Sequence, residues 1–537
     1  MLFLLLISVL LSIPTVQTKL ATYVTQKIND DFGVNLVIKK VDLSFLGNVQ
    51  LKGIEIRDHH KDTLIFVNNL STSLLNAKKV IDGEVQLKSI SLDGVEYHMK
   101  TYKGENDDNM AIFIDRFKND SPKDSLNPFI LKTSTIYAND LNFKLINENN
   151  KNPLLFSAKN IGGTLQDFSI VGPDLFIKIR GLYFLDNKGL EITNLTTDFT
   201  YSLTAMQFKN TTLQTRTSDV KANIDFTYKR KDLADFNDKV TIKATFDKSK
   251  LSVTDLKKYY NELSGNDVLN FTGKVTGSLN NFVAKDLNIS SNRGLKVRGD
   301  LSFTNVVNTE RGFIFGGNFK NLTTTYKNLK NILPNLLGKT LPTEFDKLGK
   351  FSLAGLIDVT PNKMNANIHI NSEIGATISD LQITNIDNID NAKYDGKIEL
   401  QDFDIGVFFN DPLFGKISLK GDVNGSGFTL NTINTTFTGT VSSFGFNEYN
   451  YQNIAADGQY QNNKFDGNLS IDDKNFKMTF NGLADLSSKV HKFDFKSDIT
   501  YLNLKETNLF TRDSISNVKG NIALDIEGNT FDDIVGK

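Results

Sequence analysis

The sequence predicts an all-β protein, in which repeated antiparallel strands build one elongated sheet and a single helix lies near the N-terminus. Three observations support this fold class. Apolar and polar residues alternate along most of the chain after residue 34, which is the period of half-buried strands. Turn signals such as NKG, NRG, NG and GSG recur along the chain, as expected for an antiparallel meander. Segments with helical spacing are few.

The N-terminal residues predict an anchor followed by a helix. Residues 1–13 are apolar and uncharged, but they are shorter than the roughly 20 residues that cross a bilayer. They also lack the basic start and the cleavage site of a signal peptide. A signal peptide, a buried helix and the second half of a transmembrane anchor that begins upstream are the three interpretations, and we favour the anchor. Residues 14–33 show helical spacing and end near Gly33, which predicts an amphipathic helix leading into the sheet.

The alternation predicts repetitive sheet over residues 34–325 and again over residues 351–537. In the segment KANIDFTYK, for example, Ala222, Ile224, Phe226 and Tyr228 share one face, and charged or polar residues occupy the other. Blocks of strand, glycine-rich turn and strand resemble one another, which favours a solenoid-like array. Such a sheet has one dry face that must be covered.

Two segments interrupt the strand pattern. Residues 253–263, VTDLKKYYNEL, predict a short amphipathic helix. Residues 326–350 predict helical pieces broken by Pro334 and Pro342, because proline removes a helical hydrogen-bond donor. We therefore divide the chain at this second interruption.

Composition excludes several classes of function. Of the 537 residues, 61 are Lys or Arg and 62 are Asp or Glu, so no basic surface for nucleic acid is predicted. Cysteine is absent, which removes thiol catalysis, thiolate metal sites and disulfides. No nucleophile elbow or phosphate-binding loop occurs either. We expect neither an enzyme nor a bound cofactor.

Two adjacent histidines, His59 and His60, lie between Asp58 and Asp62. A zinc site draws three or four ligands from separated segments, and neighbouring residues of a strand point to opposite faces. The other histidines are far along the chain. We therefore interpret residues 58–62 as a polar turn between two strands, and we predict no metal site.

The N-terminal segment resembles a known family. Pro14, Val16, Gln17, Leu20 and Ala21 fit the Pro-x-Val-Gln-x-x-Leu-Ala helix at the start of the TamB group of AsmA-like proteins. The stretch VQLKGIEIRDHHKDTL, residues 49–64, fits the strand unit and the turn that follow in that group. The resemblance is specific over residues 13–105 and architectural beyond them. It places the two histidines in a strand-connecting turn.

The resemblance implies an inner-membrane protein of Gram-negative cells, with a single N-terminal anchor and a long periplasmic sheet curled into a trough with an apolar interior. It also implies phospholipid traffic between the two membranes, and an Omp85-type outer-membrane partner engaged through the far C-terminus. The sequence ends at FDDIVGK in mid-pattern. We therefore expect an N-terminal fragment or a split reading frame, in which that partner contact is missing.

We expect phospholipid acyl chains to contact the apolar strand faces. The predicted lining residues are Phe226, Tyr228, Phe271, Val275, Leu301, Phe303, Ile417, Leu419, Phe465, Leu469, Phe476, Met478 and Phe480. Two other functions stay open. A passive envelope scaffold would close its sheets into tightly packed sandwiches, and an assembly factor for outer-membrane proteins would pair clients with exposed strand edges.

Overall fold

A computed structural model of the chain describes residues 14–43, 48–74, 84–116, 130–261, 263–332, 343–387, 391–428, 432–511, 516–528 and 535–537. The all-β prediction is confirmed: 66% of the described residues are in strands and 12% are in helices. The described strands belong to one 27-stranded sheet that does not close into a barrel. The predicted anchor, residues 1–13, lies outside the described residues.

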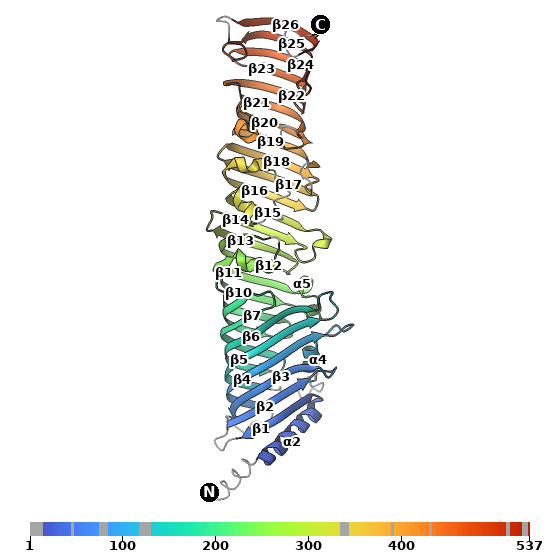
Figure 1. Ribbon diagram of the computed structural model, residues 1–537, viewed down its shortest axis with the longest axis vertical. Helices are drawn as coiled ribbons and strands as arrows, with labels where there is room; N and C mark the ends of the chain where they lie inside the picture. Colours follow the sequence, from blue (N-terminus) through green and yellow to red (C-terminus); the bar gives the residue numbers. More distant parts are fainter. Residues whose placement is uncertain are drawn as a thin grey trace. The chain divides into compact units, whose positions relative to one another are not determined.

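Contacts between residues divide the chain into two units. Unit 1 comprises residues 1–260 and 270–279, and unit 2 comprises residues 261–269 and 280–537. In each unit the strands follow one another in the order of the sequence (Figure 1).

Unit 1 begins with the predicted helix and continues as strands. Its elements are α2 (Pro14–Phe32), β1 (Asn35–Leu43), β2 (Asn48–Arg57), β3 (Thr63–Leu74), β4 (Glu84–Thr101), α4 (Asn109–Asp115), β5 (Ile130–Asn147), β6 (Leu154–Val171), β7 (Asp174–Asp186), β8 (Glu191–Tyr201), β9 (Ala205–Gln214), β10 (Asp219–Thr227), η2 (Arg230–Asp235), α5 (Phe236–Lys239), β11 (Thr241–Ser252), α6 (Val253–Leu256) and most of β12 (Val268–Gly277).

Unit 2 continues the alternation with short helical insertions. Its elements are β13 (Asn281–Ser291), β14 (Lys296–Thr304), η3 (Thr309–Arg311), β15 (Ile314–Thr325), α7 (Tyr326–Ile332), η4 (Thr343–Leu348), β16 (Lys350–Thr360), β17 (Lys363–Ser372), β18 (Gly375–Thr384), β19 (Lys393–Asp404), α9 (Ile405–Phe409), β20 (Phe414–Ser426), β21 (Asn434–Phe446), β22 (Tyr449–Gln461), β23 (Lys464–Asp472), β24 (Phe476–Asp485), β25 (Lys492–Asn503), β26 (Asn517–Glu527) and β27 (Val535–Gly536).

Two features of this order differ from the sequence prediction. The pairing of β4 with β5 is parallel, so the antiparallel meander is broken there. The helix expected over residues 253–263 ends at Leu256, after a single turn. Ser252 caps this turn, and the carboxylate of Asp255 accepts hydrogen bonds from Thr215, Thr217 and Ser218, so its polar face is committed to the β9–β10 turn. By contrast, α7 and η4 fall within the predicted helical segment, although β15 and β16 pair directly across it.

A recurring bulge bends the strands. Asn160, Asn210, Asp286 and Asp402 have left-handed backbone conformations, with φ between 47° and 53°, at positions where the pairing register shifts. Asn and Asp tolerate this conformation better than other non-glycine residues. Each shift places two residues opposite one residue of the neighbouring strand. Bulges of this kind bend the strand and increase its twist.

The neighbouring strand satisfies the backbone of each bulge. The N–H of Asp286 donates to the Asp300 carboxylate at 2.8 Å, and the N–H of Asn210 donates to the Asn223 side chain at the same distance. The Asn160 and Asp402 N–H groups have equivalent acceptors on β5 and β20. The polar row on the outer face therefore stabilises the curvature of the sheet.

Candidate functional site

The candidate site is the apolar face of the sheet. All the predicted lining residues are buried or half-buried, and none of them is exposed. Phe226 is on β10, Phe271 and Val275 on β12, Leu301 and Phe303 on β14, Ile417 and Leu419 on β20, Phe465 and Leu469 on β23, and Phe476, Met478 and Phe480 on β24. Tyr228 follows β10, and its hydroxyl donates to the Ser202 carbonyl at 2.9 Å. Their contact with lipid stays a prediction.

Aromatic rings form rows across neighbouring strands of unit 1. Phe226 contacts Phe208 on β9 and Phe236 on α5, with ring centroids 6.0 and 5.6 Å apart. A second row follows β4 to β7 and joins Tyr97, Phe143, Phe156 and Phe184. Each row runs across the strands rather than along one of them. The apolar face is therefore continuous from strand to strand.

Unit 2 carries similar rows and an open groove. Phe480 contacts Phe465 on β23 and Phe495 on β25, with centroid distances of 6.1 and 4.8 Å. Beside these rings lies a groove of about 870 Å³ that crosses β21 to β26. On each strand it is lined by one residue of the inward row and by that residue's two neighbours. The inward residues, aligned by the strand register, are Gly439, Ala456, Leu469, Phe480, Ser497 and Ile522.

Strand directions show how strongly unit 1 curls. Because β4 and β5 are parallel and the following pairs are antiparallel, the C-terminal ends of β4 and β10 lie at opposite edges of the sheet. The helix α4 begins beside β4, where the Asn109 side chain bonds the backbone of His98 and Lys100. It ends beside η2, which follows β10. A seven-residue helix spans only about 10 Å, so the two edges approach each other closely.

Arg230 holds the far end of α4. Its guanidinium donates to the Asp115 carboxylate at 2.6 Å and to the Ala111 carbonyl at 2.9 Å. At the near end Asp108 caps the helix by accepting from the Ala111 N–H at 2.7 Å. Burial is the main cause that raises the pKa of Asp108, and burial likewise raises the pKa of Tyr97. Polar groups at this crossing are thus partly withdrawn from water, as expected over the mouth of an apolar trough.

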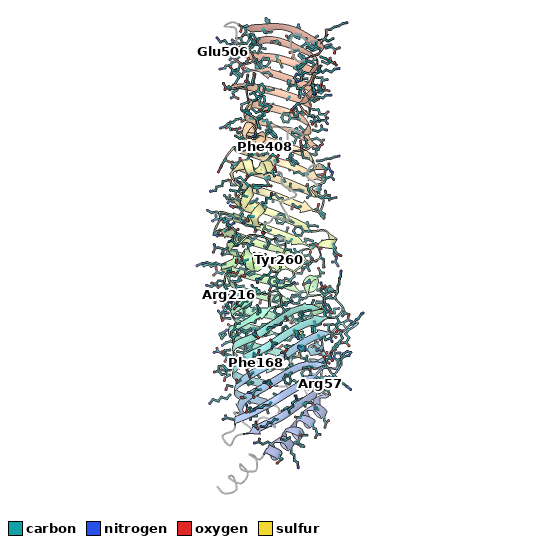
Figure 2. The ribbon with its side chains drawn as sticks, viewed as in Figure 1. Arg57, Phe168, Arg216, Tyr260, Phe408 and Glu506 are labelled. Carbon is teal, nitrogen blue, oxygen red and sulfur yellow. The ribbon has the colours of Figure 1, made fainter. Side chains whose placement is uncertain are left out.

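In unit 2 short helices cover one edge of the apolar face. Leu329 of α7 and Phe345 and Leu348 of η4 pack with Phe351 and Phe403 of the sheet. Phe408 of α9, labelled in Figure 2, contacts Phe345 and Phe403 at centroid distances of 6.4 and 5.5 Å. The strands that precede α7 and α9 end at the same edge of the sheet, because an even number of antiparallel pairings separates them. The sequence predicted helical pieces over residues 326–350, which include α7 and η4, but it predicted neither α9 nor the position of all three along one edge.

The turn containing the two histidines is formed as predicted. The Asp58 carboxylate accepts from the backbone N–H groups of His60 and Asp62, and also from the Tyr102 hydroxyl at 2.7 Å and the Asn109 side chain at 2.9 Å. Asp58 is only 2% exposed. A buried carboxylate with four donors fixes the turn between β2 and β3 to the segment that follows β4.

Two further observations bear on identity. No helix among the described residues is long and apolar enough to cross a bilayer. Comparisons with protein-family models, with curated proteins and with solved structures find no match.

Proposed function

We propose that this protein belongs to the TamB group of AsmA-like proteins and carries phospholipids from the inner to the outer membrane along its apolar trough. The observation that carries the proposal is the apolar face of each unit, with its cross-strand rows of rings, together with the groove of about 870 Å³ in unit 2. That volume lies within the range of about 300–1,000 Å³ typical of sites for small molecules. The groove also crosses several strands, as a path for a long apolar chain requires.

The physical need for such a trough follows from acyl-chain hydration. Each CH₂ transferred from water to an apolar surface contributes about 0.8 kcal/mol, so a two-chain lipid crosses an aqueous space only on a continuous dry surface. Headgroups would stay in water along the open edge. Transfer of this kind needs shape and apolarity rather than a catalytic group. The curl of unit 1 supports the proposal over a scaffold of packed sandwiches.

The proposal places the protein in the inner membrane through its N-terminal residues, with the sheet in the periplasm. An Omp85-type outer-membrane protein is the proposed partner through a more C-terminal region. Reporter enzymes fused near residue 120 test this topology. A reporter that is active only in the periplasm should be active, and a reporter that is active only in the cytoplasm should be inactive. Activity only of the reporter that requires the cytoplasm would contradict the topology without bearing on the groove.

Photo-crosslinking in cells tests the lipid path. A photoreactive amino acid replaces Phe226 or Phe465 on the inward face, and Lys221 or Asp466 on the outward face as the matched control. Phe465 and Asp466 are adjacent on β23, so they share local structure but not orientation. We expect mass spectrometry to find phospholipid attached at the inward positions. Equal capture at both faces, or none, would exclude the conduit, and capture of unfolded outer-membrane protein along a strand edge would favour the assembly factor.

A further inference from the structure

We propose that His59, His60 and Glu105 form a site for a divalent transition-metal ion, of which Zn²⁺ is the best fit. The structure places His59 Nε2 2.9 Å from Glu105 Oε2, and His60 Nε2 2.7 Å from Glu105 Oε1. The three potential ligand atoms all lie within 4.8 Å of one another. Glu105 comes from the turn after β4, so the ligands are drawn from two separated segments.

The turn explains how adjacent histidines can act together. On a strand their rings would point to opposite faces. Residues 59 and 60 instead lie in the turn that the Asp58 carboxylate fixes, and both rings pack against Tyr102, with centroid distances of 5.5 and 3.9 Å. His59 Nδ1 is buried without a hydrogen-bond partner, so Nε2, which faces Glu105, is the nitrogen through which this ring makes its polar contact. The ligands are thus oriented before any ion binds.

The ligand set indicates the class of ion. Two imidazoles and one carboxylate suit zinc and its neighbours better than the hard cations, which prefer oxygen alone. Zinc bonds of about 2.0–2.2 Å in a tetrahedron separate the ligand atoms by roughly 3.3 Å. The observed separations of 2.7 and 2.9 Å need to widen by about half an ångström. The His60 side chain is 46% exposed, so water can reach a fourth position.

A bound ion would link the β2–β3 turn to the segment just before α4. Asn109, the first residue of α4, already bonds Asp58, which in turn holds the backbone of His60. Coordination by Glu105 would add a second link between the same two segments. The ion would therefore stabilise the start of the helix that crosses the mouth of unit 1.

Zinc titration of the full chain tests the site. Isothermal calorimetry with Zn²⁺ alone gives the stoichiometry, and Co²⁺ in place of Zn²⁺ reports the coordination geometry by its visible absorption. We expect one site per chain, an intense tetrahedral Co²⁺ spectrum, and at least tenfold weaker binding in His60→Gln and Glu105→Gln. His98→Gln is the matched control, because His98 lies 3.5 Å from the single carboxylate of Glu96. This variant should bind as the wild type does.

Two results would overturn the proposal. One is wild-type zinc binding no tighter than that of Glu105→Gln, and the other is an equal loss in His98→Gln. If circular dichroism shows that the His60 and Glu105 variants do not fold, modification of the wild-type histidines by diethyl pyrocarbonate replaces them as the measurement. Zn²⁺ should then protect His59 and His60 but not His98, and modification unchanged by Zn²⁺ would refute the site.

Discussion

Truncation of Phe480 distinguishes a groove from a sealed core. The Phe480 side chain is 8% exposed, and it stands between Phe465 and Phe495 at the side of the groove. Replacement by alanine removes roughly 130 Å² of apolar surface, of which about nine-tenths is buried. At about 25 cal/mol per Å² the lost transfer free energy is about 3 kcal/mol.

A sealed core would lose more. Removing a phenyl group from a closed site leaves a cavity of roughly 100 Å³, which adds about 2.4 kcal/mol at 24 cal/mol per Å³. Because Phe480 borders open space, we expect no such addition and a total near 3 kcal/mol rather than 5. Phe480→Asp should cost more than Phe480→Ala, because it places an unpaired charge on the apolar face.

Hydrogen exchange of peptides from β23 to β25 in the full chain measures this cost, since it reports local opening free energies where global unfolding of a repetitive sheet is not a single transition. Thr479→Ala and Thr479→Ser are the matched controls, because Thr479 is the exposed neighbour on the same strand. They should change the opening free energy by less than about 0.5 kcal/mol. A cost of about 5 kcal/mol for Phe480→Ala would show that the face is sealed, and the reasoning would fail.

Three other substitutions test the contacts that stabilise the curled sheet. Arg230→Ala removes both contacts to α4, so the amides of this helix should exchange hydrogen at least tenfold faster, whereas the amides of β6 should not. Unchanged exchange in α4 would mean that the arginine does not hold this helix in place. Asp300→Ala removes the acceptor for the backbone N–H of Asp286 at the bulge and should lower local stability by about 1–3 kcal/mol. Asp300→Asn keeps an acceptor oxygen, so it should keep most of that stability. Equal rates of amide hydrogen exchange in the two variants would contradict this role. Burial alone would raise the pKa of Asp255, but hydrogen bonds from three hydroxyl groups outweigh burial and lower this pKa. The carboxylate therefore stabilises the fold above about pH 4, and its contribution is lost as the pH falls through the folded-state pKa. A melting temperature that depends on acid pH in the same way in Asp255→Asn as in the wild type would refute the effect.

The alternation of residue types predicts that the lining residues of one strand share a face, because successive side chains of a strand point to opposite faces. Phe476, Met478 and Phe480 had to share a face once β24 was extended. The bulges were not predicted. At each bulge two residues lie opposite one residue of the neighbouring strand, so the alternation of apolar and polar residues shifts by one position. A single Asn or Asp among other polar residues gives no sequence signal for a left-handed backbone.

Contacts between segments far apart in the chain were also not predicted from the sequence. Glu105 lies 45 residues after His60, and no periodicity links the two. The parallel pairing of β4 and β5 sets the direction of every later strand in unit 1, and thereby the edge at which Arg230 meets Asp115. Local pattern fixes which face a side chain occupies, whereas strand order and direction decide which faces and edges meet.

Glycine explains how a concave sheet can carry so many rings. Side chains on the inner side of a curl crowd one another, so large residues on neighbouring strands need a small one between them. A Cβ added to Gly439 would lie 2.3 Å from the Lys420 carbonyl oxygen and 2.9 Å from the Phe437 ring. The same ring lies over Gly421, the register partner of Gly439 on β20. Because Gly421 and Gly439 have no side chains, the backbones of β20 and β21 can approach closely there, which allows the sheet to curve. The same two glycines leave the space that the Phe437 ring fills. The groove beside Phe480 begins at Gly439, which adds no side chain to its floor.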